Sequence, residues 1–172
     1  MPSLHRLTAS DLPRMRQFWT ERWGDDFMIV NGTTFRPDNL SGFIALDGIE
    51  WVGAVTFTFT ETECEIISLD SLRENEGIGT ALVNAVVEEA RQLNCCRVFL
   101  ATTNDNLRAL GFHQKRGFSL SALRPGVMEE SRKIKPSIPL IGENNIPLRD
   151  ELELEMALTP DPFAKHLSGA PK

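Results

Sequence analysis

The hydrophobic pattern of this chain changes its period at Gly77-Ile78-Gly79, and this change limits the possible folds more than any other feature of the sequence. Residues 63–69 read as a strand that follows two other strand-like runs, at 41–46 and 50–60. After the glycines, apolar residues recur at helical spacing over about 17 residues, and residues 97–101 form a new apolar strand. A strand, a helix and a strand in this order predict two parallel strands joined by a right-handed crossover.

The remaining segments complete a single α/β (α+β) domain. Close turns between the three strand-like runs before the glycines predict an antiparallel meander. We expect the domain to cover residues 1–158 and a flexible C-terminal tail to cover residues 159–172. The other predicted elements are a first strand at 4–8, a helix that begins after Ser10 or Asp11, an irregular stretch at 24–39, a helix at 107–116, a strand at 118–123, a long loop at 125–147 and a strand at 151–158.

The composition argues against several classes of function. Eighteen basic residues against 24 acidic ones give a formal net charge of −6, which does not suit the binding of a nucleic-acid backbone. No apolar run approaches the roughly 20 residues that span a bilayer, so we expect no membrane interaction. The three cysteines are odd in number and two are adjacent, which is typical of reduced thiols in a cytoplasmic protein. The histidines and cysteines form no metal-binding pattern, so we expect no metal.

A Gly-x-Gly turn between a strand and a helix can bind an anion. The first turn of a helix presents unpaired N–H groups and a partial positive charge, and glycines let a phosphate approach the main chain closely. A plain tight turn explains the same residues about equally well. Leu82 stands where a dinucleotide fingerprint needs a further glycine, and the Gly-Lys-Ser/Thr sequence of a nucleoside-triphosphate loop is absent from the sequence.

Two motifs in the expected order resemble the GNAT superfamily of acetyltransferases. Residues 74–82 read ENEGIGTAL, where the family has Gln/Arg-x-x-Gly-x-Gly/Ala at the start of its central helix. Residues 106–118 read NLRALGFHQKRGF, close to the family's later Asn-x-x-Ala-x-x-Phe-Tyr-x-x-x-Gly-Phe. Position 74 departs from the pattern, because it is Glu instead of Gln or Arg. The resemblance covers roughly residues 4–158.

The resemblance implies a fold, a co-substrate and a set of binding residues. The fold is a mixed, mostly antiparallel sheet of six or seven strands flanked by helices, in which the parallel strands at 63–69 and 97–101 splay apart. The co-substrate is acetyl-CoA, with its diphosphate on the N–H groups of residues 75–80 and its pantetheine arm along the main chain of the splayed strand. The implied cofactor-binding residues are Leu69, Ser71, Glu74, Asn75, Glu76, Gly77, Ile78, Gly79, Thr80, Asn106 and Arg116.

The same resemblance implies candidates for proton transfer. Glu63 has the spacing of a general-base glutamate in the histone-modifying branch of the superfamily, and Glu65 shares its strand face. His113 stands where the family usually has a tyrosine that protonates the leaving thiolate, and this chain contains no tyrosine. Both roles have plainer alternatives. The glutamates would be solvated surface charges, and His113 would only pack beside the sulfur while water supplies the proton.

The implied function is transfer of an acetyl group to a primary amine by direct attack in a ternary complex. The acceptor would be a small-molecule amine or a protein amino group, and a homodimer is possible by analogy with the family. A non-catalytic acyl-CoA-binding regulatory module is the alternative, because Glu74 and the missing tyrosine depart from the family pattern. We expect the segment at 125–147 to fold over the acceptor side and to help select the substrate.

Overall fold

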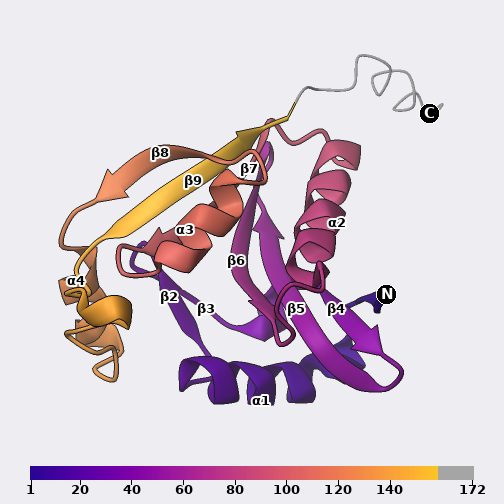
Figure 1. Ribbon diagram of the computed structural model, residues 1–172, viewed down its shortest axis with the longest axis horizontal. Helices are drawn as coiled ribbons and strands as arrows, with labels where there is room; N and C mark the ends of the chain where they lie inside the picture. The colour runs from indigo at the N-terminus through magenta and orange to yellow at the C-terminus, as the bar shows by residue number, and fades with distance from the viewer. Residues whose placement is uncertain (159–172) are drawn as a thin grey trace, which may run out of the picture.

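A seven-stranded sheet forms the centre of the computed structural model, which describes residues 1–158 (Figure 1). Its strands are β1 (Ser3–Arg6), β4 (Ser41–Asp47), β5 (Glu50–Phe59), β6 (Glu63–Ser71), β7 (Arg97–Thr103), β8 (Ser119–Arg124) and β9 (Glu151–Ala157). Their order across the sheet is β1-β4-β5-β6-β7-β9-β8. Within the described residues, β6 and β7 are the one parallel pair of this sheet. The predicted mixed, mostly antiparallel α/β fold is confirmed, with the larger of the two expected strand numbers.

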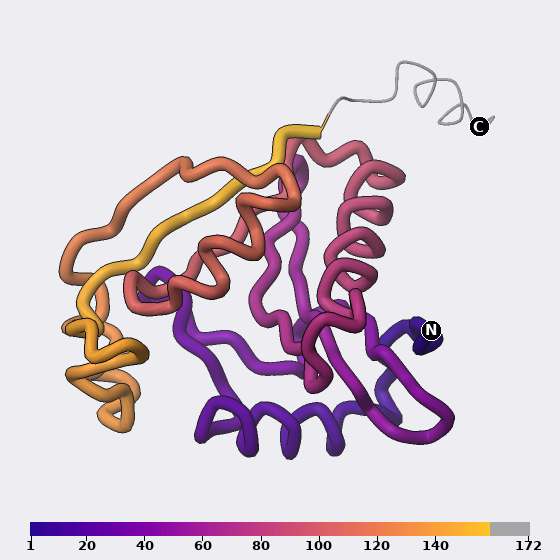
Figure 2. Tube along the Cα trace, viewed as in Figure 1, coloured from indigo at the N-terminus to yellow at the C-terminus, as the bar shows by residue number. Residues whose placement is uncertain are grey.

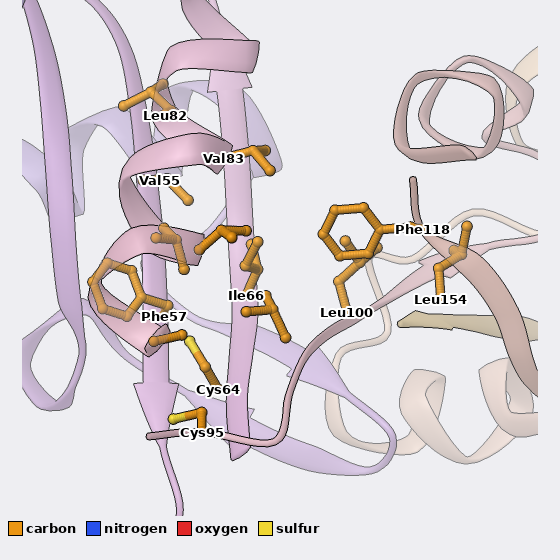
Figure 3. Close-up of a cluster of buried hydrophobic side chains, with 14 of the residues drawn as sticks. Val55, Phe57, Cys64, Ile66, Leu82, Val83, Cys95, Leu100, Phe118 and Leu154 are labelled. Atoms are coloured by element: carbon orange, nitrogen blue, oxygen red, sulfur yellow. The ribbon is translucent and has the colours of Figure 1, made fainter. Parts of the chain in front are cut away.

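Two helices cover opposite faces of this sheet. Leu82 and Val83 of the second helix belong to the larger hydrophobic core, together with Val55 and Ile66 of the sheet (Figure 3). Met15 and Trp19 of the first helix are fully buried against a smaller apolar cluster on the other face. The predicted helix after Gly77 is therefore confirmed, at 15 residues. The α-helices are α1 (Leu12–Trp23), α2 (Ile78–Gln92), α3 (Leu107–Gln114) and α4 (Val127–Ile134), and the short 3₁₀ turns are Ala9–Asp11, Pro37–Asn39 and Glu143–Asn145.

The parallel strands β6 and β7 separate part-way along their length. Their pairing begins at the first residue of each strand and ends at Ile66 and Leu100. Relative to β5, Ile67 is an extra residue in β6, and such a bulge bends a strand and interrupts its pairing. Beyond this point β7 stays paired with β9 as far as Thr103 and Glu151. The predicted splayed parallel pair is confirmed, and the bulge gives it a physical cause.

The stretch at 24–39, expected to be irregular, contains a hairpin. β2 (Met28–Val30) pairs antiparallel with β3 (Thr33–Phe35), and Asn31 and Gly32 form the turn with positive φ angles of 48° and 74°. Strands of three residues are too short for alternation to be recognised in a sequence, whereas the Asn-Gly dipeptide marks the turn.

The segment at 125–147, expected to be a loop, contains the short helix α4. A helix of eight residues is not stable by propensity alone, so tertiary contacts must hold it. The segment folds back beside the end of α1 (Figure 2), where Lys135 Nζ donates to the carbonyl oxygens of Trp23 and Phe27 at 3.2 and 3.3 Å. Arg132 also donates to the carbonyl oxygens of Ile138 and Pro139. The four prolines between 125 and 147 hide this helix from pattern analysis.

None of the helices in residues 1–158 is both long and apolar enough to cross a membrane. The tail predicted at 159–172 lies outside the described residues.

Candidate active site

A cavity of about 390 Å³ lies where β6 and β7 diverge. The strands contribute residues 66–69 and 100–103 to its wall, and α3 contributes residues around its first and second turns. The opposite wall comes from the end of α1, from β2, from the α4 segment and from the start of β9. One cavity therefore has two sides, an α3 side and a β2–α4 side. The residues discussed below that line it are Trp23, Met28, Val30, Ile67, Leu69, Asp105, Asn106, His113, Met128, Lys135, Ile138, Pro139, Leu148 and Glu151.

The glycine turn is open at its outer surface and closely packed at its inner one. Asn75 and Gly77 have positive φ angles of 61° and 76°, and Gly77 is the N-cap residue of α2. A Cβ added at Gly77 would meet nothing within 4 Å, so a phosphate can approach the N–H groups of the first turn from outside. A Cβ at Gly79 would lie 3.1 Å from the Phe112 ring, so this glycine is needed for close packing of α2 on α3. The geometry fits the predicted diphosphate cradle.

Two arginines of α3 and the turn that follows it face this cradle. Arg116 donates from Nε and Nη2 to Thr80 Oγ1 at 2.8 and 2.6 Å, and its guanidinium lies over the Phe112 ring. Arg108 forms an exposed ion pair with Glu74 at 2.5 Å. Position 74 is acidic in this chain, but its carboxylate holds the Arg108 guanidinium beside the turn.

The other predicted cofactor-binding residues occupy the strand end and the loop before α2. Leu69 lines the cavity, and Ser71, the last residue of β6, donates its hydroxyl to the carbonyl oxygen of Arg73 at 2.8 Å. Glu76 is exposed, with its carboxylate 3.8 Å from the Arg73 guanidinium. Ile78 is buried and anchors the turn to the larger hydrophobic core.

His113 is buried on the α3 side of the cavity. It is 5% exposed, and its ring centroid lies 5.0 and 5.3 Å from those of Phe112 and Phe118. Its Nδ1 atom is buried without a hydrogen-bond partner in residues 1–158. Burial, helped by the charge of Arg116, lowers the pKa of His113 to about 4, so the imidazole is neutral at neutral pH. Asn106 also lines this side, and its Oδ1 accepts a hydrogen bond from the Ala109 N–H at the start of α3.

The two predicted base glutamates do not line the cavity. Glu63 lies in the paired part of β6, and its carboxylate accepts a hydrogen bond from Arg97 Nε at 2.7 Å. Arg97 also binds Glu153 and Glu155, so Glu63 belongs to a charged network on the face of the sheet away from α2. Glu65 is half-buried, and burial together with the charge of Glu153 raises its pKa. The cavity begins at Ile66, and both glutamates precede it.

Three buried charged residues of the cavity wall were not predicted. Glu151 is 3% exposed, accepts a hydrogen bond from the Asn31 N–H at 3.0 Å, and has its pKa raised by burial. Asp105 and Lys135 are 5% and 8% exposed. The Leu-Glu alternation of residues 151–155 predicts the strand but not which glutamate meets a cavity. Asp105 directly precedes the motif residue Asn106, which was the one available signal.

Comparisons with known proteins agree with this geometry. A model of the acetyltransferase (GNAT) family matches residues 4–118. The uncharacterized proteins YdhI and YxbD of Bacillus subtilis (strain 168) are 45% and 46% identical to the chain, and each match covers 80% of the chain and 87% of the relative.

Solved structures share the fold. A GNAT family acetyltransferase from Elizabethkingia anophelis with acetyl-CoA bound has a TM-score of 0.67 at 22% identity, and the match covers 91% of this chain and 97% of that one. A Bacillus subtilis acetyltransferase in complex with CoA also has a TM-score of 0.67, at 19% identity, and the match covers 92% and 100% of the two chains. The family match, together with the two motifs and the splayed strands, shows that the chain belongs to the acetyltransferase (GNAT) family.

Proposed function

We propose that this protein is an N-acetyltransferase that moves the acetyl group of acetyl-CoA to a primary amine within a ternary complex. The observation that carries the proposal is the cavity where β6 and β7 diverge, which is lined by α3 on one side and by β2, the α4 segment and the buried Glu151 on the other. A thioester held on the first side and an amine held on the second would meet between the splayed strands.

The α3 side has the groups that acetyl-CoA needs. The N–H groups of residues 75–80 at the start of α2 bind the diphosphate, and the main chain near Leu69 and Ser71 binds the pantetheine arm. Arg116 lies beside Thr80, where its charge favours the phosphates. Glu74 does not bind phosphate in this proposal, but orients Arg108 toward it. Asn106 supports the start of α3 next to the thioester.

The reaction is a direct displacement at the thioester carbonyl. The amine nitrogen forms a bond to the carbonyl carbon, the C–S bond breaks, the amine loses a proton to a carboxylate, and the thiolate takes up a proton to become the free thiol. An N–H group near Leu69 stabilises the oxyanion, and losing such a donor costs about 3 kcal/mol of transition-state stabilisation. We assign proton removal to Glu151, because it lines the cavity and burial raises its pKa. Glu65 and Glu63 do not line the cavity, and the Glu63 carboxylate binds Arg97.

His113 acts as a neutral side chain in this scheme. Because its pKa is about 4, it does not enter the reaction as an imidazolium. It donates a hydrogen bond to the departing sulfur, and water supplies the proton. For His113→Phe we expect kcat to fall about tenfold, the value of one hydrogen bond, with no change in the shape of the pH–rate profile between pH 6 and 9. A limb of the wild-type profile that disappears in the variant would instead identify His113 as the acid.

A free-thiol release assay tests the proposal. With acetyl-CoA present, we expect thiol release that depends on added amine, across a panel of amino acids, polyamines, aminoglycosides and peptides. Acetyl-CoA binding by calorimetry without release for any amine would favour the alternative of a non-catalytic acyl-CoA-binding module. The possible homodimer stays a prediction that light scattering checks.

A further inference from the structure

Three buried charged residues of the cavity wall, Glu151, Asp105 and Lys135, form no ion pair within 4 Å among residues 1–158. Glu151 is assigned to proton removal above, which leaves Asp105 and Lys135, of opposite sign. Asp105 is 5% exposed and Lys135 is 8% exposed. A buried charge without a counter-charge is costly to the fold, because neither water nor an opposite charge compensates its lost hydration. Such groups therefore indicate a ligand that supplies the missing charges.

Asp105 has one satisfied and one unsatisfied carboxylate oxygen. Its Oδ2 accepts a hydrogen bond from the Glu143 N–H at 2.7 Å, which ties the turn at Glu143–Asn145 to the end of β7. Its Oδ1 is buried and has no partner in the described chain. Asp105 immediately precedes Asn106, the N-cap of α3, and its hydrogen bond to Glu143 places it where the α3 side of the cavity meets the segment after α4. A cation or a strong hydrogen-bond donor at this place would satisfy Oδ1.

Lys135 has the complementary property. Its Nζ donates to the main-chain oxygens of Trp23 and Phe27 and lies 5.1 Å from the centroid of the Phe27 ring. An ammonium group has three N–H donors, so these two carbonyls do not use all of them. Burial lowers the pKa of Lys135, and the charge of Asp25, which is not within ion-pair distance, offsets only part of this effect. An anionic group of a ligand would compensate this charge.

Most of the other side chains on the β2–α4 side of the cavity are apolar. Its wall includes Met28, Val30, Met128, Ile138, Pro139 and Leu148. The whole cavity measures about 390 Å³, near the lower end of the roughly 300–1,000 Å³ of ligand pockets, and the thioester end of acetyl-CoA must share it. The space left for the acceptor therefore suits a small molecule with an apolar body.

We propose that the acceptor is a small zwitterion, with its primary amine at Asp105, its carboxylate at Lys135 and an apolar side chain between β2 and α4. Amino acids with apolar side chains are the simplest members of this class. This inference rests on the proposed acetyltransferase function, and it excludes a protein N-terminus as the acceptor, because a peptide bond there removes the charge that Lys135 pairs with.

Calorimetry on the full chain saturated with coenzyme A tests the zwitterionic acceptor separately from the acetyltransferase function, because it measures acceptor binding without the reaction. The probes are L-methionine, its decarboxylated form 3-(methylthio)propylamine, and L-methionine methyl ester, with L-leucine and isoamylamine as a second pair. We expect each amino acid to bind at least about tenfold more tightly than its amine or ester. Lys135→Met should abolish this preference while leaving the affinity for the amines unchanged.

Lys133→Met is the matched control, because Lys133 lies in the last turn of α4, which Lys135 caps, and forms only an exposed ion pair with Glu130. It should keep the full preference for the amino acids. Asp105→Asn should weaken the binding of the amino acids and of the amines by the same factor. If Lys135→Met weakened the binding of all probes equally, Lys135 would only attach α4 to α1, and the proposal would be overturned. A dipeptide with N-terminal methionine that binds as tightly as methionine would also overturn it. Thiol release from none of the amines, with the binding preference intact, would instead refute the acetyltransferase function alone.

Discussion

The two sides of the cavity are constructed in different ways. The α3 side and the neighbouring glycine turn, which are proposed to bind acetyl-CoA, offer main-chain N–H groups and glycines from two continuous stretches, 74–82 and 106–118. The β2–α4 side uses single side chains from several separate segments, among them Met28, Met128, Lys135 and Glu151. A main-chain site tolerates substitution of most side chains, whereas a side-chain site changes specificity with each of them. The contrast predicts a donor site of the kind shared across the family and an acceptor site specific to this protein. The following experiments test whether the two sides act separately.

The largest effect is expected for Glu151→Gln on the acceptor side. The amide keeps the shape and an oxygen for the Asn31 N–H, but it cannot take a proton from the amine. We expect kcat to fall about 100-fold or more, in the range of general-base catalysis, while KM for acetyl-CoA changes less than about twofold. Steady-state kinetics with both substrates varied give the two values.

Glu155→Gln is the control for this variant, because Glu155 is on the same face of β9 and contacts Arg97 outside the cavity. A comparable loss of kcat in both variants would mean that the charged network as a whole, and not Glu151, supports the reaction.

The second effect concerns His113, on the α3 side. Its folded-state pKa of about 4 lies below the ordinary 6.5, so the unfolded chain takes up the proton first as the pH falls. Stability from this residue is therefore complete above pH 6.5 and is lost between pH 6.5 and 4, by about 3 kcal/mol at about 1.4 kcal/mol per pKa unit. Urea unfolding of wild type and His113→Phe at several pH values measures the difference.

We expect the stability of His113→Phe to change less with pH over that interval. His5→Phe, at an exposed position, should behave as wild type. Parallel stability curves for wild type and His113→Phe would show that the imidazole is not neutral and buried, and would remove the basis for its assigned role.

The third effect concerns the close packing of α2 on α3. In Gly79→Val the added carbons would press on the Phe112 ring, and overpacking of this kind costs about 1–3 kcal/mol. We expect KM for acetyl-CoA to rise about tenfold and acceptor affinity to stay unchanged. Gly111→Ala in α3 is the control, because a Cβ there meets nothing within 4 Å. An equal change in acceptor affinity for Gly79→Val would argue against separate sides.

The smallest effect is expected at the exposed pair of Glu74 and Arg108. Arg108→Glu should raise KM for acetyl-CoA a few-fold at low salt, and less at high salt, because exposed charges are screened. The double exchange Glu74→Arg with Arg108→Glu restores an arginine near the phosphates and should return KM toward the wild-type value. If the double variant had a KM for acetyl-CoA as high as that of the single variant, an arginine at position 74 would not replace the one at position 108.

The sequence by itself predicts most of the fold, because its signals are local and periodic. The strand, glycine turn and helix around Gly77 establish the parallel pair, and the motif at 106–118 adds α3. The predictions of an irregular stretch at 24–39 and a loop at 125–147 missed the β2–β3 hairpin and the α4 helix, because elements this short depend on tertiary contacts such as those of Lys135. The proposed donor side could be described from the sequence for the same reason as the fold, because contiguous residues form it.

Only the tertiary structure decided the acceptor side. It placed Glu63 in an ion pair with Arg97 and brought Glu151, Asp105 and Lys135, which are up to 46 positions apart, to one cavity. It also showed that His113 is buried deeply enough to stay neutral. Burial and long-range proximity set the pKa values and the unpaired charges, and both are properties of the packed chain that no local pattern of residues contains.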